Sequence, residues 1–286
     1  MTIGRDGWKN RHAMARMDRW RRCPRRWKRR ARPLVPEDSG ADANHPFTIA
    51  AFPNENPVLS GGRRISGWKK VEGKSGLWQT TIPEVRERKW YFRQLFINGR
   101  RKQRARTPND GYFQAVGDYL AENPVSFKYH DGDIKKEWAG AGAEVIALHK
   151  WIDLRQFVRA VDETNRIVTL SANIAQHVKE PDARYYVENA PDALDSPGEW
   201  HLDRKTGVLS YQAEADEDLN NAEVIAPFIQ SALLKAEGNF AAGKQVQHVV
   251  LRGLTFAHTD WTLPEKGYLD TQAAVHVRGD ILLEGA

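Results

Sequence analysis

The chain has 286 residues and a formal net charge of +6, but residues 1–32 carry a net charge of +11 and residues 33–286 a net charge of −5. Residues 33–286 are numerous enough to bury a substantial core, and they contain no run of about eighteen apolar residues that would predict a membrane span. The one Cys of the chain is Cys23, which excludes disulfides, a thiolate zinc site and a Cys nucleophile from residues 33–286.

The basic segment at residues 1–32 has a composition that cannot build a core. It contains thirteen Lys or Arg and two Asp or Glu, and Ile3 is its only Val, Ile or Leu. Basic residues interleaved with Trp are typical of an arm that binds nucleic acid or a membrane surface. A targeting signal is disfavoured because the segment lacks an apolar run. The interpretation that we adopt is translation of a GC-rich gene in the wrong frame, which predicts a disordered or arbitrary tail that binds nucleic acid only non-specifically.

Strand signals dominate residues 33–286. The first predicted strands, at 47–52 and 58–62, are bounded by Gly rather than closed by tight hairpins. The next, at 90–97, runs into Asn98-Gly99, a dipeptide that fits a tight hairpin because both positions tolerate positive φ. Further strands and hairpins are predicted at 125–129, at 158–161 with 167–170, and at 200–203 with 208–211, and short helices at 191–194 and 229–236. Repeated hairpins favour an antiparallel sandwich or barrel.

The last predicted strands, at 246–256 and 274–277, again lack hairpin turns. Gly253 stands at a corner within the first of them. Strands about 25 residues apart with a Gly at the corner suggest successive coils of a parallel β-helix, in which each coil is buried against its neighbours. Two coils do not establish a period.

Five motifs carry a resemblance to a known family. They are VPEDSG at 35–40, PVLSGG at 57–62, WYFRQLFING at 90–99, RARTPN at 104–109 and GLTFAHTDW at 253–261. In this order they resemble the N-terminal half of bacterial right-handed parallel β-helix proteins similar to glycoside hydrolase family 141. The resemblance covers residues 33–286 and implies a carbohydrate-active protein that acts on plant or algal polysaccharide.

The resemblance also implies an all-β architecture in four parts. The basic tail at 1–32 precedes a first β-helix segment at 33–62, an antiparallel β-sandwich-like insertion at 63–240 interrupts the helix, and the β-helix resumes at 241–286. Family members continue for further coils, so we expect this chain to be a fragment that lacks the catalytic coils. The family implies an extracellular or periplasmic location, although the chain shows no signal peptide.

Candidate chemistry gathers at residues 258–270. Glycoside hydrolysis needs two carboxyl groups, one of them with a raised pKa, and Asp260 and Asp270 are the weak catalytic candidates. Trp261, Tyr268 and His258 are candidates for contact with the sugar, because aromatic faces pack on pyranose rings and loops that leave a β-helix form clefts. The alternative is structural: a turn cap, a packed Trp and a hydrogen-bonded His.

A basic cluster at residues 100–106 is a second candidate site. Alternation along a strand places Arg100, Lys102, Arg104 and Arg106 on one face, and Arg104 and Arg106 are candidates for gripping an acidic glycan through carboxylate contacts. In the structural alternative this row is a solvated strand face, or Arg104 or Arg106 joins the insertion to the helix.

Other function classes find little support. The nine His show no metal-binding spacing, and neither a calcium loop nor a phosphate-binding Gly-rich loop is present, so no metal and no cofactor are expected. The expected partner is a polysaccharide or oligosaccharide. A non-catalytic glycan-binding or structural module, a polysaccharide lyase and a basic-tailed polyanion binder stay as alternatives. The sugar and the oligomeric state are not predicted.

Overall fold

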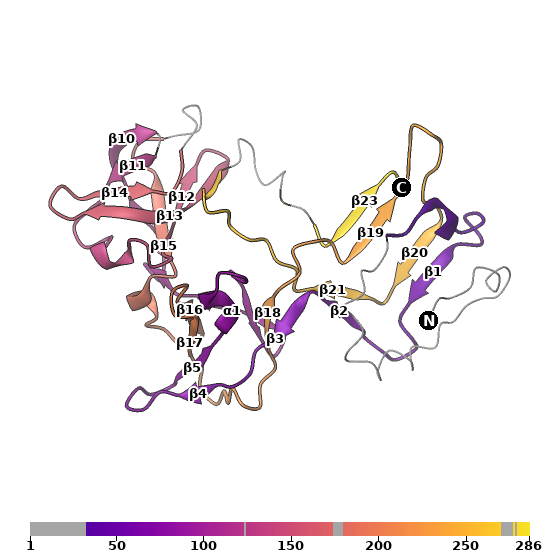
Figure 1. Cartoon of the computed structure of the whole chain (residues 1–286), viewed down its shortest axis with the longest axis horizontal. Helices are drawn as coiled ribbons and strands as arrows, with labels where there is room; N and C mark the ends of the chain where they lie inside the picture. Colours follow the sequence, from indigo (N-terminus) through magenta and orange to yellow (C-terminus); the bar gives the residue numbers. More distant parts are fainter. Residues whose placement is uncertain (1–32, 123, 174–179, 270–276, 278) are drawn as a thin grey trace. The chain divides into compact units, whose positions relative to one another are not determined.

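The computed structural model describes residues 33–122, 124–173, 180–269, 277 and 279–286 (Figure 1). These residues form an almost entirely β structure, which confirms the predicted all-β class. The helices in the described part are short: the 3-10 helices η2 (Pro36–Asp38), η3 (Lys136–Trp138) and η5 (Pro191–Ala193) and the α-helix α1 (Pro83–Arg86). The basic tail lies outside the described residues, as do Asp270 and most of the strand predicted at 274–277.

The chain forms two compact units. Unit 1 contains residues 33–60, Ala232–Ala257 and Gly279–Ala286, and unit 2 contains Gly61–Ser231 and the described residues that follow Ala257 up to 277. Unit 1 is therefore assembled from three segments, and the two segments of unit 2 lie between them in the sequence.

Unit 1 consists of parallel strand pairs. Its strands are β1 (Phe47–Ala50), β2 (Val58–Ser60), β19 (Leu234–Glu237), β20 (Val249–Arg252), β21 (Thr255–Ala257) and β23 (Ile281–Glu284). Strand β1 pairs with β20, β2 with β21 and β19 with β23, all in parallel. Gly253 separates β20 from β21 with a φ of 67°, a left-handed conformation that glycine adopts readily. Residues 47–60 and 249–257 therefore run side by side, but a parallel β-helix is not shown by the described residues.

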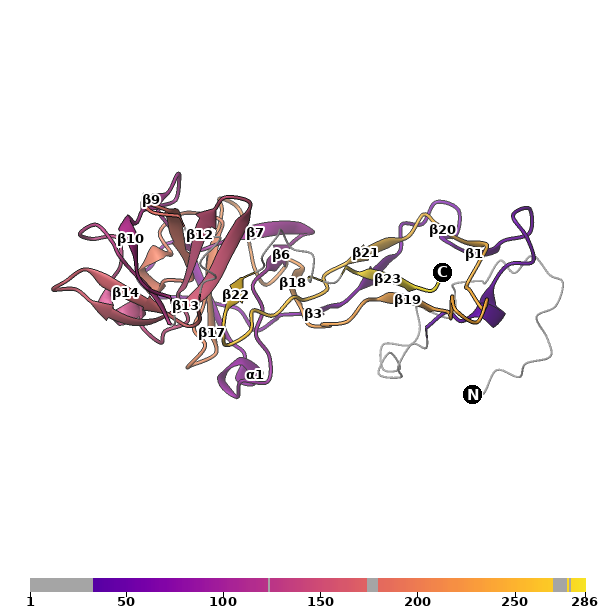
Figure 2. The same ribbon diagram turned by 90° about the horizontal axis from the view of Figure 1, so that it is seen from above.

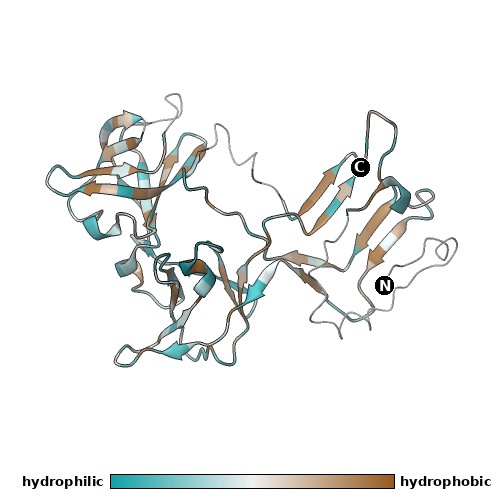
Figure 3. Cartoon of the chain, in the orientation of Figure 1, coloured by the Kyte–Doolittle hydropathy of each residue, from teal (hydrophilic) through white to brown (hydrophobic). Residues whose placement is uncertain are grey.

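Many apolar side chains of unit 1 are exposed to solvent. Phe240 is 77% exposed, Leu283 63% and Val58 54%. Figure 3 shows these short strands as largely hydrophobic. Among the described residues of this unit, Ala236 and Val246 are the buried apolar ones, so these residues do not enclose a core.

Unit 2 contains a nine-stranded sheet, seen from two directions in Figures 1 and 2. Its strands are β8 (Arg106–Thr107), β9 (Phe113–Gln114), β10 (Val116–Glu122), β11 (Val125–Lys128), β12 (Glu144–His149), β13 (Ile152–Asp162), β14 (Ile167–Leu170), β15 (Arg184–Glu188) and β22 (Tyr268–Leu269). All the pairs are antiparallel, and β22 pairs with β13 on the edge opposite to β12.

An eight-stranded sheet forms the rest of unit 2. It contains β3 (Gly62–Arg64), β4 (Lys69–Lys70), β5 (Leu77–Thr81), β6 (Leu95–Ile97), β7 (Arg100–Arg104), β16 (Glu199–Leu202), β17 (Val208–Gln212) and β18 (Val224–Pro227). Strands β7 and β16 pair in parallel, whereas their neighbours pair antiparallel.

The predicted hairpins are confirmed. Asn98 and Gly99 have φ values of 49° and 76° and join β6 to β7, with Ile97 opposite Arg100. Strands β13 and β14 and strands β16 and β17 also pair antiparallel. The helix predicted at 229–236 is wrong, because Leu234–Glu237 is strand β19 and gains its backbone partners from β23. The apolar residues of this segment fit a helical spacing and a strand alternation equally well. Pairing with the distant strand β23 determines that the segment is a strand.

Each sheet of unit 2 has its own hydrophobic core. Val145, Leu154 and Tyr185 belong to the cluster of the nine-stranded sheet, and Phe92 and Trp200 belong to a separate cluster in the eight-stranded sheet. The antiparallel pairing expected for this part of the chain is therefore largely confirmed, and the two sheets have separate hydrophobic clusters.

Candidate functional site

One face of the nine-stranded sheet presents polar and aromatic side chains. Directly opposed residues in antiparallel strands point to the same face, and Ile146 lies opposite both Tyr186 and Arg155, which in turn lies opposite Tyr268. Their neighbours along the strands, among them Val145, Ala147, Leu154 and Tyr185, belong to the core. Alternation therefore places Tyr186, Arg155 and Tyr268 on the face away from the core, which we call the outer face.

The segment that follows His258 is anchored to unit 2 by its backbone. Thr259 forms a parallel bridge with Ile229, and the backbone N–H of Asp260 donates to the Ile229 carbonyl at 2.8 Å. The ring of Trp261 lies edge-on to that of Tyr268, with centroids 5.0 Å apart. The structure thus brings together the two aromatic residues that the sequence singled out.

Asp260 has a perturbed acidity. Burial raises the pKa of its carboxyl group above the ordinary value, although hydrogen bonds from Thr262 and Gln230 and the charge of Arg93 act in the opposite direction. The Thr262 hydroxyl donates to Asp260 Oδ2 at 2.5 Å. Arg93 also lies over the Trp261 ring, at 5.7 Å from its centroid. A carboxyl group with a raised pKa therefore stands beside an aromatic pair.

His258 is placed for packing. Its ring lies edge-on to that of Phe96, with centroids 4.6 Å apart, and burial lowers the pKa of its imidazole. A Cβ atom on Gly62 would lie 2.9 Å from the Cβ atom of His258 and 2.3 Å from Ile225 Cγ2. The close approach depends on glycine, and these contacts favour the structural alternative for His258.

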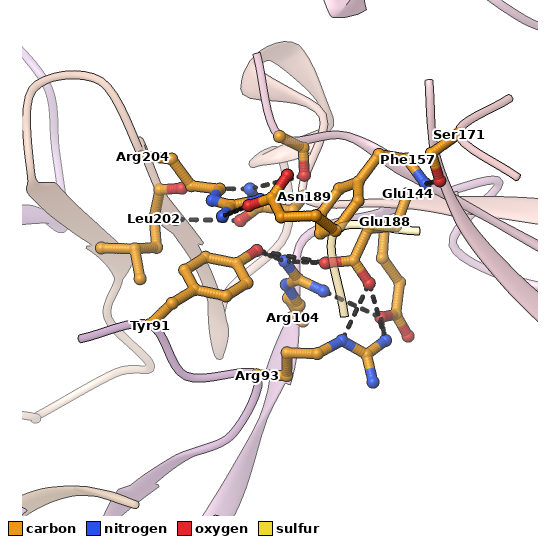
Figure 4. Close-up of polar contacts among 12 residues, drawn as sticks. Tyr91, Arg93, Arg104, Glu144, Phe157, Ser171, Glu188, Asn189, Leu202 and Arg204 are labelled. Carbon is orange, nitrogen blue, oxygen red and sulfur yellow. Dashed lines mark hydrogen bonds and ion pairs between the residues drawn. The ribbon is translucent and has the colours of Figure 1, made fainter. Parts of the chain in front are cut away.

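Glu144 is the centre of a buried ion network that the sequence analysis missed (Figure 4). Its side chain is fully buried. It accepts hydrogen bonds from Arg93 Nε at 2.8 Å, Arg104 Nη2 at 2.8 Å and the Tyr91 hydroxyl at 3.1 Å. Both guanidinium groups also reach Glu188 Oε2, at 3.2 and 3.3 Å. The network joins residues of the nine-stranded sheet to residues in and beside the eight-stranded one.

Burial alone would raise the pKa of Glu144, but the charges of Arg104 and Arg93 outweigh it and hold the pKa at about 2. Burial also raises the pKa of Tyr91. Glu144 is therefore a permanently charged acceptor that cannot serve as a general acid near neutral pH.

Arg204 extends the network toward the Trp261 segment. Its guanidinium lies 4.4 Å from the Tyr91 ring centroid and 4.8 Å from that of Phe157. It donates to Glu265 Oε1 at 2.8 Å. The network and the aromatic pair are therefore neighbouring parts of one region of unit 2.

The predicted basic row is buried at Lys102 and Arg104, whereas Arg100 is exposed. Lys102 and Arg104 do share a face of β7, but Arg104 is only 5% exposed. Lys102 pairs with Glu214 and Glu217. The guanidinium of Arg104 is held by Glu144 and Glu188. Arg104 therefore has a structural role inside unit 2, and it neither lies on a solvated face nor joins the insertion to a β-helix.

Arg106 lies beyond the buried row, on β8 of the nine-stranded sheet. Its guanidinium stacks on Tyr186 at 4.1 Å from the ring centroid. Its Nε donates to the Pro108 carbonyl at 3.0 Å, and its Nη2 to the Gly111 carbonyl at 2.7 Å. Of the two predicted arginines, Arg106 is therefore the one on the outer face.

Long-range pairing explains why Arg93, Glu144 and Glu188 were missed. A local signal did exist for Glu144, since it opens the apolar run EVIAL at 144–148, and an acid at the start of a buried strand requires a partner. Its partners Arg93 and Arg104 are 51 and 40 residues away in the sequence, so their identity could not be predicted.

The described part of the chain lacks two other features. Its residues provide no group of three or more His, Cys, Asp or Glu that could hold a metal ion. They also provide no helix long and apolar enough to cross a membrane.

The chain is similar in structure and sequence to a solved protein. No protein-family model and no curated protein matches it. A solved structure described as a glycoside hydrolase matches with a TM-score of 0.66 and 27% sequence identity. The match covers 85% of this chain and 43% of the other chain, so the described fold corresponds to less than half of that protein's length. The chain therefore has a glycoside hydrolase-like fold.

Proposed function

We propose that this chain is the carbohydrate-binding part of a glycoside hydrolase-type protein, and that Trp261 and Tyr268 contact a polysaccharide or oligosaccharide. The observation that carries the proposal is the 27% identity and TM-score of 0.66 to a glycoside hydrolase over 85% of the chain. The pair of aromatic rings at 5.0 Å supports it, since aromatic residues combine large apolar faces with polar edges.

The proposal includes the architecture expected for relatives of glycoside hydrolase family 141. In it, β1, β2, β20 and β21 belong to adjacent coils of a right-handed parallel β-helix, and residues 63–240 form the insertion that interrupts it. Parallel pairing in register and the left-handed Gly253 between β20 and β21 support this assignment. The exposed apolar side chains of unit 1 support it as well, because a coil buries its side chains against neighbouring coils.

We propose binding, rather than bond cleavage, for the described residues. A raised pKa suits Asp260 for donating a proton. Hydrolysis also needs a second carboxyl group, at about 5–5.5 Å for retention or 6.5–9.5 Å for inversion, whereas the charged group that acts on Asp260 is Arg93. The other catalytic candidate, Asp270, lies outside the described residues.

Calorimetric titration of the full chain with neutral and acidic oligosaccharides tests the proposal. We expect measurable affinity that falls roughly tenfold in Trp261→Ala, because the sugar loses an aromatic contact. Trp151→Ala is the matched control, since Trp151 is 58% exposed on the β12–β13 hairpin of the same unit. A parallel assay for new reducing ends distinguishes a hydrolase from a binding module. Absence of binding to every saccharide, or equal losses in both variants, would refute the proposal.

A further inference from the structure

We propose that the outer face around Arg106, Tyr112, Arg184 and Tyr186 binds an anionic oligosaccharide, one that carries carboxylate or sulfate groups. We call these four residues the arginine–tyrosine cluster. The inference rests on the proposed function and specifies the class of saccharide. Tyr186, Ile146, Arg155 and Tyr268 occupy one row across four strands of this face. Ile146 is fully buried, so the cluster is a surface separate from Tyr268.

The cluster alternates positive and aromatic groups at short range. Arg106 lies 4.1 Å from the Tyr186 ring centroid and 5.9 Å from that of Tyr112. Arg184 lies 5.1 Å from the Tyr112 centroid, and the two rings are 6.1 Å apart. Stacking on an aromatic face holds a guanidinium in place without neutralising its charge. The two arginines are therefore oriented in advance of ligand binding.

Neither arginine has a carboxylate partner among the described residues. Arg106 uses Nε and Nη2 on backbone carbonyls, which leaves Nη1 without a hydrogen bond in the described part of the chain. Arg184 is exposed, and its guanidinium group contacts the aromatic ring of Tyr112. Uncompensated guanidinium groups recognise carboxylate or sulfate oxygens through charge-assisted hydrogen bonds.

Two acids of this sheet are already engaged by other cations. Glu188 is bound by Arg93 and Arg104, and Asp153 pairs with Arg155 at 2.5 Å. The positive charge of Arg106 and Arg184 is therefore not neutralised by these two carboxylates. It contrasts with the net charge of −5 on residues 33–286.

The aromatic members favour a saccharide over a small inorganic anion. Tyr112 is 47% exposed, so part of its side chain is accessible beside the two guanidinium groups. An aromatic surface contributes affinity to an apolar sugar face, and the arginines select the saccharides that carry negative charge. A small anion would gain nothing from the rings.

The test is a titration of the full chain with three tetrasaccharides: tetragalacturonate, a sulfated carrageenan tetrasaccharide and neutral cellotetraose. We expect Arg184→Gln and Arg106→Gln each to weaken binding of at least one anionic tetrasaccharide by roughly tenfold or more, with little change for cellotetraose. The anionic tetrasaccharide that is affected identifies carboxylate or sulfate as the recognised group. Arg106→Lys keeps the charge but loses the planar fork, so it should have an intermediate effect.

The matched control is Arg159→Gln, which removes a positive charge from an exposed position on β13. Thermal unfolding of each variant verifies the fold, and Arg184→Gln is informative even if Arg106→Gln unfolds, since Arg184 is exposed. Equal losses in Arg159→Gln and Arg184→Gln, or unchanged anionic affinity in both cluster variants, would overturn the inference. If binding that depends on Trp261 persisted in that case, the proposed function would stand without it.

Discussion

Substitution of Glu144 by Gln tests whether the buried network stabilises unit 2. The amide keeps the shape of the side chain, but it removes the negative charge and turns an NH2 group toward one of the two guanidinium groups that donated to the carboxylate. Removing one partner of a buried ion pair costs about 3–5 kcal/mol, because the remaining charge is left without compensation. Glu188 still contacts both arginines, so we expect the lower end of this range.

Acid unfolding provides a second measure of the same interaction. The pKa of Glu144 falls from its ordinary value of 4.5 to about 2 in the folded protein. Its contribution is therefore complete above pH 4.5 and is lost as the pH falls toward 2. A difference of two to three pKa units corresponds to about 3 kcal/mol. The free energy of unfolding of Glu144→Gln should therefore fall less between pH 4.5 and pH 2 than that of the wild type.

Guanidinium chloride unfolding between pH 2 and pH 7, followed by Trp fluorescence, measures both effects. Glu84→Gln is the matched control, since its salt bridge with Arg63 is well exposed and should contribute less than about 1 kcal/mol. The proposed stabilisation would be refuted if Glu144→Gln and the wild type had equal unfolding midpoints at pH 7. It would also be refuted if both lost stability equally between pH 4.5 and pH 2.

Two further predictions concern unit 2. Gly62→Ala should lower the free energy of unfolding by about 1–3 kcal/mol, because the new Cβ would lie 2.3 Å from Ile225 Cγ2. Gly279→Ala is the control, since Gly279 is not left-handed and, among the described residues, a Cβ there would meet only the Ile281 carbonyl oxygen, at 3.6 Å. An equal loss in both variants would contradict the steric argument. Burial, with a smaller effect from Arg104, holds the pKa of His201 at about 4 in the folded protein. Folding therefore favours the neutral imidazole, and the free energy of unfolding should decrease by about 3 kcal/mol as the pH falls from 6.5 to 4. Chemical unfolding of His201→Gln should show a flatter profile over this range, and an unchanged slope would disprove the assignment.

Local patterns predicted those parts of the fold that local chemistry controls. Asn98-Gly99 specifies its hairpin through backbone conformation, and the hairpin formed as expected. Leu234 and Ala236 lie in a strand because β23 pairs with it, and a partner more than forty residues away leaves no mark on the local sequence. For the same reason, the sequence did not predict that the two sheets of unit 2 have separate cores.

The candidate site divides in the same way. Trp261 and Tyr268 were selected for their proximity in the sequence, and they are in contact. Alternation correctly placed Lys102 and Arg104 on one face of β7, but it could not show that this face is covered. That depends on Glu144 and on Glu214, which approach from distant strands and loops.

The parallel pairs of unit 1 carry a consequence for the order of folding. Ser60 lies opposite Ala257, and closing a loop of about 200 residues costs roughly 3 kcal/mol more than closing a loop of about five. Unit 2 can remove most of this cost by folding first, because its backbone bonds from Phe228 and Ile229 to Gly61, and from Asp260 to Ile229, bring its own two ends together. Folded unit 2 would then hold the flanking strands of unit 1 close together before they pair. The strand pairs of unit 1, although distant in the sequence, would then form as fast as a local hairpin. The folding of unit 2 would be the slow step.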